Sequence, residues 1–166
     1  MSKSSRKVRR MCPENEPQPT PFRVRPYQLG DGQSVLEICR RSPQSSQWPK
    51  ETYDQAHSSG QIVLIAELNG QICGFVVARI TGDEAEILNA AVDPAHRRKG
   101  VGSALLTTAI SAAQGQNAKT IYLEVRESNS AAVSFYQRHG FEKAAERHGY
   151  YSSPTENAVV MKKLTV

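Results

Sequence analysis

Apolar and polar residues recur along the chain with two different periods, and these periods predict strands and helices. Alternation, or a short unbroken apolar run, is typical of a strand, whereas apolar residues three and four apart are typical of a helix. Strands are predicted at residues 22–25, 62–68, 72–80, 85–92, 120–125, 141–150 and 158–164. Helices are predicted after Asp31, over about residues 50–57 and 100–114, and from Asn129 to His139.

Turn-forming residues separate these elements. Asn69-Gly70 lies between two apolar runs and is a strong hairpin signal, because both turn positions must accept positive φ. Asp31 and Asn129 are residue types that cap helix N-termini, and Gly140 stands where a left-handed residue commonly ends a helix. The order of elements predicts an α/β domain with a mixed, mostly antiparallel sheet of about seven strands, flanked by about four helices.

The first 20 residues differ in composition from the rest of the chain. Basic residues are followed there by prolines, a composition that cannot bury a core. We therefore predict a disordered tail at residues 1–20, basic and then proline-rich, and one folded domain at residues 21–166. The full length of 166 residues is typical of a single domain.

The protein has a net charge of +5, and the positions of its basic residues decide whether this charge indicates nucleic-acid binding. Five basic residues lie in the tail: Lys3, Arg6, Lys7, Arg9 and Arg10. Residues 11–166 hold 16 basic and 16 acidic side chains, so the folded part is formally neutral and is not expected to bind nucleic acid directly. The apolar runs are too short to cross a bilayer, so no membrane association is expected.

The cysteines and histidines indicate neither a disulfide framework nor a metal site. The three cysteines are widely spaced, the histidines lack metal-ligand spacing, and we predict a protein of the reducing cytoplasm without a metal. The basic start lacks the apolar stretch of a secretory signal, although a Ser/Arg-rich start can also imitate an organellar transit peptide.

The segment with the most chemical information is Arg97-Arg98-Lys99-Gly100-Val101-Gly102-Ser103. It joins a predicted strand to a predicted helix, and its two glycines allow the backbone to approach a ligand closely. Free N–H groups at a helix start, together with the helix dipole and three cations, favour a pyrophosphate. A glycine pair beside a basic run also occurs in solvated turns, and that alternative stays open on these residues alone.

Three neighbouring motifs resemble the acetyl-CoA signature of the GNAT superfamily of N-acetyltransferases. They are Ala90-Ala91-Val92-Asp93-Pro94, Arg97-x-x-Gly-x-Gly and Ala104-Leu105-Leu106. The segments around Leu123-Glu124-Val125-Arg126, Phe135-Tyr136 and His139-Gly140-Phe141 are similar to the ribosomal-protein alanine N-acetyltransferase branch, known as RimI. Together the motifs cover about residues 22–164.

This resemblance implies transfer of an acetyl group from acetyl-CoA to the N-terminal amine of a protein, with a small-subunit ribosomal protein as the expected acceptor. Two alternatives are acetylation of a small-molecule amine or a lysine side chain, and a non-catalytic acyl-CoA-binding module. The resemblance places the pantetheine arm along residues 90–92, the pyrophosphate on residues 98–103, and Asn129 against the cofactor. The predicted cofactor-binding residues are Ala90, Ala91, Val92, Arg97, Arg98, Lys99, Gly100, Val101, Gly102, Ser103 and Asn129.

The resemblance also assigns Glu124 as general base and Tyr136 as general acid. An amine is mostly protonated at neutral pH and must lose a proton before it attacks a thioester, which a carboxylate can accept. A phenol can protonate the departing thiolate. Without the family resemblance, Glu124 would be interpreted as a solvent-facing strand residue and Tyr136 as a packing residue. Glu86 on the preceding strand is a rival base, because other GNAT branches place a carboxylate there.

Overall fold

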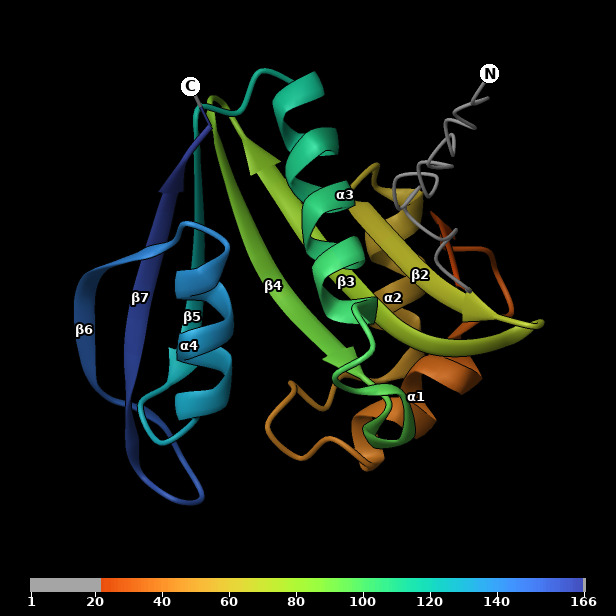
Figure 1. Ribbon diagram of the computed structural model, residues 1–166, viewed down its shortest axis with the longest axis horizontal. Coiled ribbons are helices and arrows are strands. Elements are labelled where there is room, and N and C mark those ends of the chain that lie inside the picture. Colours follow the sequence, from red (N-terminus) through yellow and green to blue (C-terminus); the bar gives the residue numbers. More distant parts are fainter. Residues whose placement is uncertain (1–21, 166) are drawn as a thin grey trace, which may run out of the picture.

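The computed structural model of the protein describes residues 22–165, so the tail predicted at residues 1–20 lies outside the described part (Figure 1). Strands and helices follow one another in the predicted order. They are β1 (Arg23–Pro26), α1 (Gly32–Arg40), α2 (Lys50–Ser58), β2 (Ile62–Leu68), β3 (Gln71–Thr81), β4 (Glu84–Val92), a 3₁₀ turn (Pro94–His96), α3 (Val101–Gly115), β5 (Thr120–Arg126), α4 (Ser130–Arg138), β6 (Glu142–Tyr151) and β7 (Glu156–Leu164). The 3₁₀ turn was not predicted.

The seven strands form one sheet in the order β1-β2-β3-β4-β5-β7-β6. Neighbouring strands run antiparallel except β4 and β5, which are parallel. The predicted mixed, mostly antiparallel sheet is therefore confirmed. The hairpin between β2 and β3 is also confirmed, because Asn69 and Gly70 have φ of 50° and 79°.

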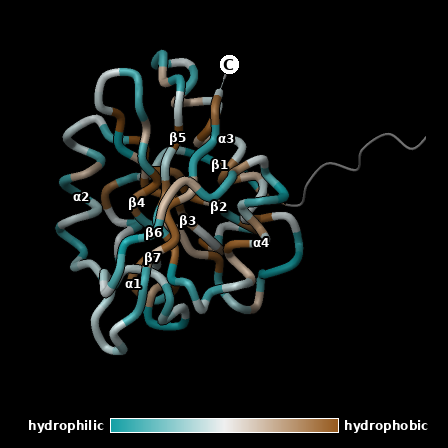
Figure 2. The backbone as a smooth tube through the Cα atoms, turned by 90° about the vertical axis from the view of Figure 1, so that its left-hand side faces the viewer, coloured by the Kyte–Doolittle hydropathy of each residue, from teal (hydrophilic) through white to brown (hydrophobic). Residues whose placement is uncertain are grey.

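Helices cover both faces of the sheet, with α3 and α4 in front of it and α1 and α2 behind it in Figure 1. Because neighbouring strand residues point to opposite faces, β2 supplies both cores. Leu64 and Ala66 pack on the side of α3, whereas Val63 and Ile65 pack on the side of α1 and α2. Figure 2 shows the hydrophobic stretches gathered in the central strands. We call the two sides the α3/α4 face and the α1/α2 face.

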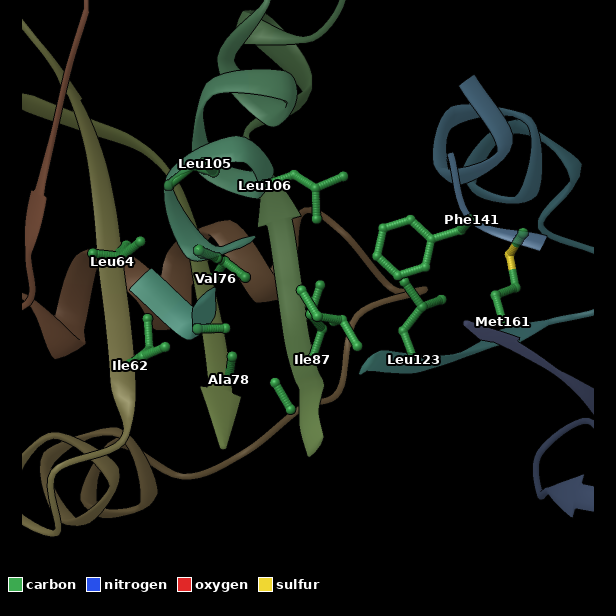
Figure 3. Close-up of a cluster of buried hydrophobic side chains, with 14 of the residues drawn as sticks. Ile62, Leu64, Val76, Ala78, Ile87, Leu105, Leu106, Leu123, Phe141 and Met161 are labelled. Atoms are coloured by element: carbon green, nitrogen blue, oxygen red, sulfur yellow. The ribbon is translucent and has the colours of Figure 1, made fainter. Parts of the chain in front are cut away.

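The core on the α3/α4 face extends from β2 to β7 (Figure 3). Leu105 and Leu106 of α3 lie over the central strands, and Leu123, Phe141 and Met161 continue the core below α4. All five side chains are buried, and full burial of one such side chain contributes roughly 1.5–3 kcal/mol. This packing fixes β5 and α4, which carry the two predicted catalytic residues, relative to α3. Within the described residues, no helix is both long and apolar enough to cross a membrane.

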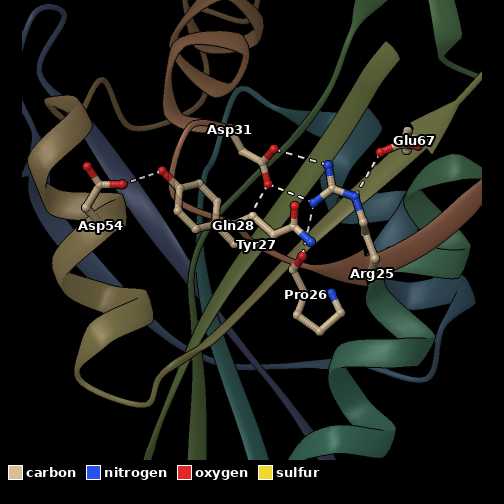
Figure 4. Close-up of polar contacts among 7 residues, drawn as sticks. All are labelled: Arg25, Pro26, Tyr27, Gln28, Asp31, Asp54 and Glu67. Atoms are coloured by element: carbon tan, nitrogen blue, oxygen red, sulfur yellow. Dashed lines mark hydrogen bonds and ion pairs between the residues drawn. The ribbon is translucent and has the colours of Figure 1, made fainter. Parts of the chain in front are cut away.

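The start of α1 differs from the prediction in one respect. Asp31 precedes the helix as expected, but its side chain makes no capping hydrogen bond. Its carboxylate instead accepts two hydrogen bonds from Arg25, at 2.8 and 3.1 Å, and one from the backbone N–H of Gln28 (Figure 4). Arg25 also pairs with Glu67 on β2 at 2.8 Å. The predicted side-chain cap is therefore wrong, because the Asp31 carboxylate binds Arg25 of β1 instead of an N–H group at the start of the helix.

Candidate active site

Strands β4 and β5 diverge and form a fork in the sheet (Figure 1). They pair only over Glu84–Ile87 and Thr120–Leu123. Just beyond this pairing, Leu88 is an extra residue in β4, because Val77 and Ala78 of β3 pair with Asn89 and Ile87. Such a bulge bends its strand. From Leu88 onward β4 keeps β3 on one edge, while within the described chain no strand pairs with its other edge.

The loop at the end of β4 leads directly into α3 and presents free backbone N–H groups. Arg98 and Gly100 have φ of 62° and 85°, and α3 begins at the next residue, Val101. The N–H groups of residues 98–103 donate to no acceptor among the residues described. The first N–H groups of a helix lack intrahelical partners, and together with the helix dipole they favour an anion. The loop therefore has the geometry of an anion site.

The three cations of this loop have different roles in the structure. Arg97 donates from Nε to the backbone oxygen of Val92 at 3.0 Å and from Nη2 to Ser42 Oγ at 2.9 Å, so its side chain anchors the end of β4. Lys99 donates to the backbone oxygen of Ala95 at 3.0 Å. Arg98 has no hydrogen bond or ion pair with another described residue. It is the cation of this loop whose guanidinium is available to a ligand.

Asn129 caps α4 as predicted, because its Oδ1 accepts a hydrogen bond from the N–H of Ala132 at 3.2 Å. Its Nδ2 donates to no other residue in the described part of the chain. An amide that caps a helix through its oxygen keeps two donors for a ligand. Asn129 can therefore serve the helix and a ligand together.

Glu124 is the first residue of β5 beyond its pairing with β4. It lies on the α1/α2 face, because its neighbours Leu123 and Val125 point into the core of the opposite face. Its side chain borders a cavity of about 490 Å³, and Oε1 is 2.6 Å from Nη1 of Arg147. This contact raises the pKa of Arg147. Glu124 is thus paired with an arginine at the branch point of the fork.

Glu86, the rival base, borders the same cavity but lies in a different place. It pairs in register with Tyr122, inside the paired part of β4 and β5. Its carboxylate accepts a hydrogen bond from Arg79 Nη2 at 2.7 Å. Because Glu124 lies where the two strands separate, its position favours it over Glu86.

Tyr136 lies on the α3/α4 face, on the other side of the sheet from Glu124. It is partly buried on α4, and its ring contacts Phe135 and Phe141, with centroids 5.2 and 5.7 Å away. Burial, and to a smaller extent the neighbouring Tyr151, raises the pKa of the Tyr136 hydroxyl to about 12. The phenol therefore keeps its proton throughout the neutral pH range.

Tyr151, at the end of β6, links the two candidate catalytic residues. Burial, followed by the carboxylate of Glu124, raises the pKa of Tyr151, and Tyr151 in turn acts on Tyr136. Arg126 lies 4.3 Å from the centre of the Tyr151 ring and pairs with Glu156 at 3.1 Å. Tyr151 is therefore near enough to Glu124 and to Tyr136 to interact electrostatically with both.

Trp48 and the Tyr150-Tyr151 pair lie in different parts of the structure. Trp48 packs against Tyr53, with ring centroids 5.6 Å apart, and joins the core under α1 and α2. Tyr150 remains 44% exposed and lies 4.0 Å below the Arg147 guanidinium. The Tyr150-Tyr151 pair is therefore beside Glu124, whereas Trp48 is mainly a packing residue.

Sequence reasoning missed Arg147. Strand β7 lies between β6 and β5, so Arg147 reaches Glu124 across a strand that pairs with both. A single arginine in a polar strand carries no local signal of this contact. Among the described residues, no group of three or more His, Cys, Asp or Glu side chains could hold a metal ion.

Residues 32–141 match the Acetyltransferase (GNAT) family, and the chain belongs to this family. It is an acetyl-CoA-dependent N-acetyltransferase, and the RimI-like resemblance is confirmed. The [ribosomal protein bS18]-alanine N-acetyltransferase of Escherichia coli K12 is 36% identical over 118 residues, which cover 69% of this chain and 78% of that protein.

Two solved structures have a similar fold. The ribosomal-protein-S18-alanine N-acetyltransferase from Escherichia coli superposes with a TM-score of 0.77 at 28% identity, over 86% of this chain and 93% of that one. Ard1 from Thermoplasma volcanium superposes with a TM-score of 0.81 at 31% identity, over 88% and 99%.

Proposed function

We propose that the protein transfers the acetyl group of acetyl-CoA to the N-terminal amine of a protein, with a small-subunit ribosomal protein as the acceptor. The observation that carries this proposal is the position of Glu124 at the branch point of the fork, beside an open cavity. The acceptor class is supported by the relative named as an alanine N-acetyltransferase of ribosomal protein bS18.

Acetyl-CoA fits the groups that the fork leaves free. The N–H groups of residues 98–103 and the guanidinium of Arg98 suit its diphosphate. The unpaired edge of residues 90–92 suits the amides of its pantetheine arm, as a sheet edge suits an added strand. Asn129 offers its Nδ2, and Arg97 acts indirectly by holding the end of β4. Acetyl-CoA supplies the acetyl thioester that is transferred.

In the proposed reaction, Glu124 accepts a proton from the acceptor ammonium and Tyr136 donates one to the departing thiolate. The free amine attacks the thioester directly, so no covalent enzyme intermediate is needed. Arg147 forms an ion pair with the Glu124 carboxylate in this structure. An ammonium that approaches Glu124 therefore competes with the guanidinium for the same oxygen.

A peptide panel tests the acceptor class through the free thiol released from acetyl-CoA. We expect release with a peptide that begins at the N-terminal alanine of a small-subunit ribosomal protein, and none with the same peptide acetylated at its N-terminus. A lysine inside that blocked peptide serves as the control for side-chain acetylation. Turnover of the blocked peptide would support lysine as the acceptor, and cofactor binding without release from any amine would support a non-catalytic module.

The glycine at the start of α3 provides a test of the cofactor site. A Cβ at Gly102 would lie 3.4 Å from the ring of Phe135, so Gly102→Val places a branched side chain against α4 and beside the free amides. We expect binding of acetyl-CoA to weaken about tenfold or more, as on losing one charge-assisted hydrogen bond. Calorimetric titration measures the affinity, and a melting curve confirms that the variant is folded.

The control is Gly115→Val at the opposite end of the same helix, where a Cβ would meet no atom within 4 Å. It introduces the same branched residue into α3 without approaching residues 98–103. We expect its affinity for acetyl-CoA to equal that of the parent protein. Equal affinities for a folded Gly102→Val variant and this control would contradict the proposed diphosphate site.

The basic tail is expected to be dispensable for the chemistry, because it carries no residue of the proposed site. A chain that begins at Pro21 should turn over a peptide acceptor at the rate of the full chain. Steady-state assays at low and high salt measure this, since contacts of a basic segment with an acidic partner weaken as salt increases. Loss of activity in the shortened, folded chain would give the tail a role in catalysis.

A further inference from the structure

A histidine at the end of α4 joins that helix to the start of α3. Nδ1 of His139 is 2.8 Å from the backbone oxygen of Phe135, and Nε2 is 3.0 Å from Oγ of Ser103. The ring is also packed against Phe135, with centroids 4.4 Å apart. The imidazole is therefore held at both nitrogens, and one of its partners belongs to the proposed diphosphate site.

These contacts determine which atoms carry protons. A carbonyl oxygen only accepts hydrogen bonds, so Nδ1 of His139 donates to Phe135. In the neutral ring Nε2 is then an acceptor, and the hydroxyl proton of Ser103 points toward it. In the protonated ring both nitrogens donate, Ser103 Oγ accepts, and the hydroxyl proton of Ser103 becomes free to donate to another group.

A diphosphate bound at residues 98–103 would favour the protonated His139 ring over the neutral ring. Its oxygens accept hydrogen bonds and carry negative charge, so they favour a Ser103 hydroxyl that donates and an imidazole that is positively charged.

We propose that His139 is a positioning residue for the cofactor, which turns the Ser103 hydroxyl toward the diphosphate and takes up a proton as acetyl-CoA binds. This inference rests on the proposed function, because it needs the diphosphate at the start of α3. Histidine is the side chain whose charge most readily changes between pH 5 and 8, so the coupling is expected in this pH range.

The charged side chains near His139 are basic, so none of them stabilises a positively charged imidazole. Arg138 precedes it on α4, Lys163 of β7 reaches toward Gly140, and Arg98 and Lys99 precede α3. No carboxylate of the described residues forms an ion pair with the ring. Cations oppose protonation of an imidazole, so the incoming phosphate, acting through the Ser103 hydroxyl, is what favours the protonated state.

Calorimetric titration in buffers with different ionisation enthalpies tests the proposal, because the measured heat then reports the protons exchanged with the buffer. Dephospho-CoA is the ligand of choice, since it keeps the diphosphate but lacks the 3′-phosphate, whose second ionisation lies near pH 6. We expect uptake of a large fraction of one proton near neutral pH. The affinity should correspondingly fall about threefold per pH unit as the pH increases, for an uptake of half a proton.

Three variants locate the proton. In His139→Gln an amide can donate permanently to Ser103, so we expect the affinity to be retained but proton uptake and pH dependence to disappear. Ser103→Ala should also lose the uptake, because the responding hydroxyl is gone. His148→Gln changes an exposed histidine on β6 and should keep both uptake and affinity.

The outcomes separate the two proposals. Normal affinity of the parent protein for dephospho-CoA without proton uptake would overturn the role of His139 and leave the cofactor site intact. Full uptake in His139→Gln or in Ser103→Ala would also overturn it. Failure of acetyl-CoA itself to bind would instead contradict the proposed cofactor site.

Discussion

Replacing Glu124 with glutamine is expected to slow acetyl transfer by about 100- to 10,000-fold at neutral pH, the usual contribution of a general base. Glutamine keeps the shape of the side chain and its hydrogen-bonding capacity but cannot accept the ammonium proton. Acetyl-CoA binding should hardly change, because Glu124 lies on the α1/α2 face, away from the loop of residues 98–103. Steady-state rates with a peptide acceptor and calorimetry with the cofactor measure the two effects separately.

The pH dependence of Glu124→Gln tests its role further. As the pH rises, more of the amine is already deprotonated, so the missing base matters less and part of the activity should return. Glu86→Gln is the matched control, because Glu86 borders the same cavity and also pairs with an arginine. Near-normal turnover of Glu124→Gln together with a large loss in Glu86→Gln would assign the base to β4 instead.

Tyr136→Phe is expected to slow turnover by about 100-fold or more, because it removes the proton donor for the departing thiolate. Phenylalanine preserves the ring contacts with Phe135 and Phe141, so the melting temperature should change little. The pKa of Tyr136 is raised to about 12, so the parent hydroxyl stays protonated up to at least about pH 9. The rate ratio between parent and variant should therefore stay constant between about pH 7 and 9.

This constancy distinguishes the acid from the base, since only Glu124→Gln should recover at high pH. Tyr122→Phe is the control, because Tyr122 lies in the same cavity as Glu124 but outside the proposed acid role. Its turnover should match that of the parent protein. Full activity of Tyr136→Phe would return this residue to a packing role in the core of the α3/α4 face.

Much of the fold could be predicted because its signals are local. Alternation and helical spacing located the seven strands and four helices of residues 22–165, and Asn69-Gly70 located a hairpin whose two turn residues do have positive φ. The loop before α3 was also readable, because glycines and cations followed by a helix are an arrangement of neighbouring residues. Asn129 caps its helix as predicted for the same reason.

The candidate site depended on contacts between distant segments, which periodicity does not report. Strict alternation would put Glu86, Leu88 and Val92 on one face, but the bulge at Leu88 reverses the faces of β4 and separates it from β5. Asp31 fits a helix cap by residue type, yet Arg25 takes its carboxylate.

The sequence by itself determined the elements, their order and the residue types available for chemistry. The tertiary structure decided which of those residues meet: Arg147 with Glu124 across β7, and His139 with Ser103 between two helices. The physical reason is that the periodicity of apolar residues indicates only which face of its own strand or helix a side chain occupies. Strand order brings Arg147 next to Glu124, which is 23 residues away in the sequence. Helix packing brings His139 next to Ser103, which is 36 residues away.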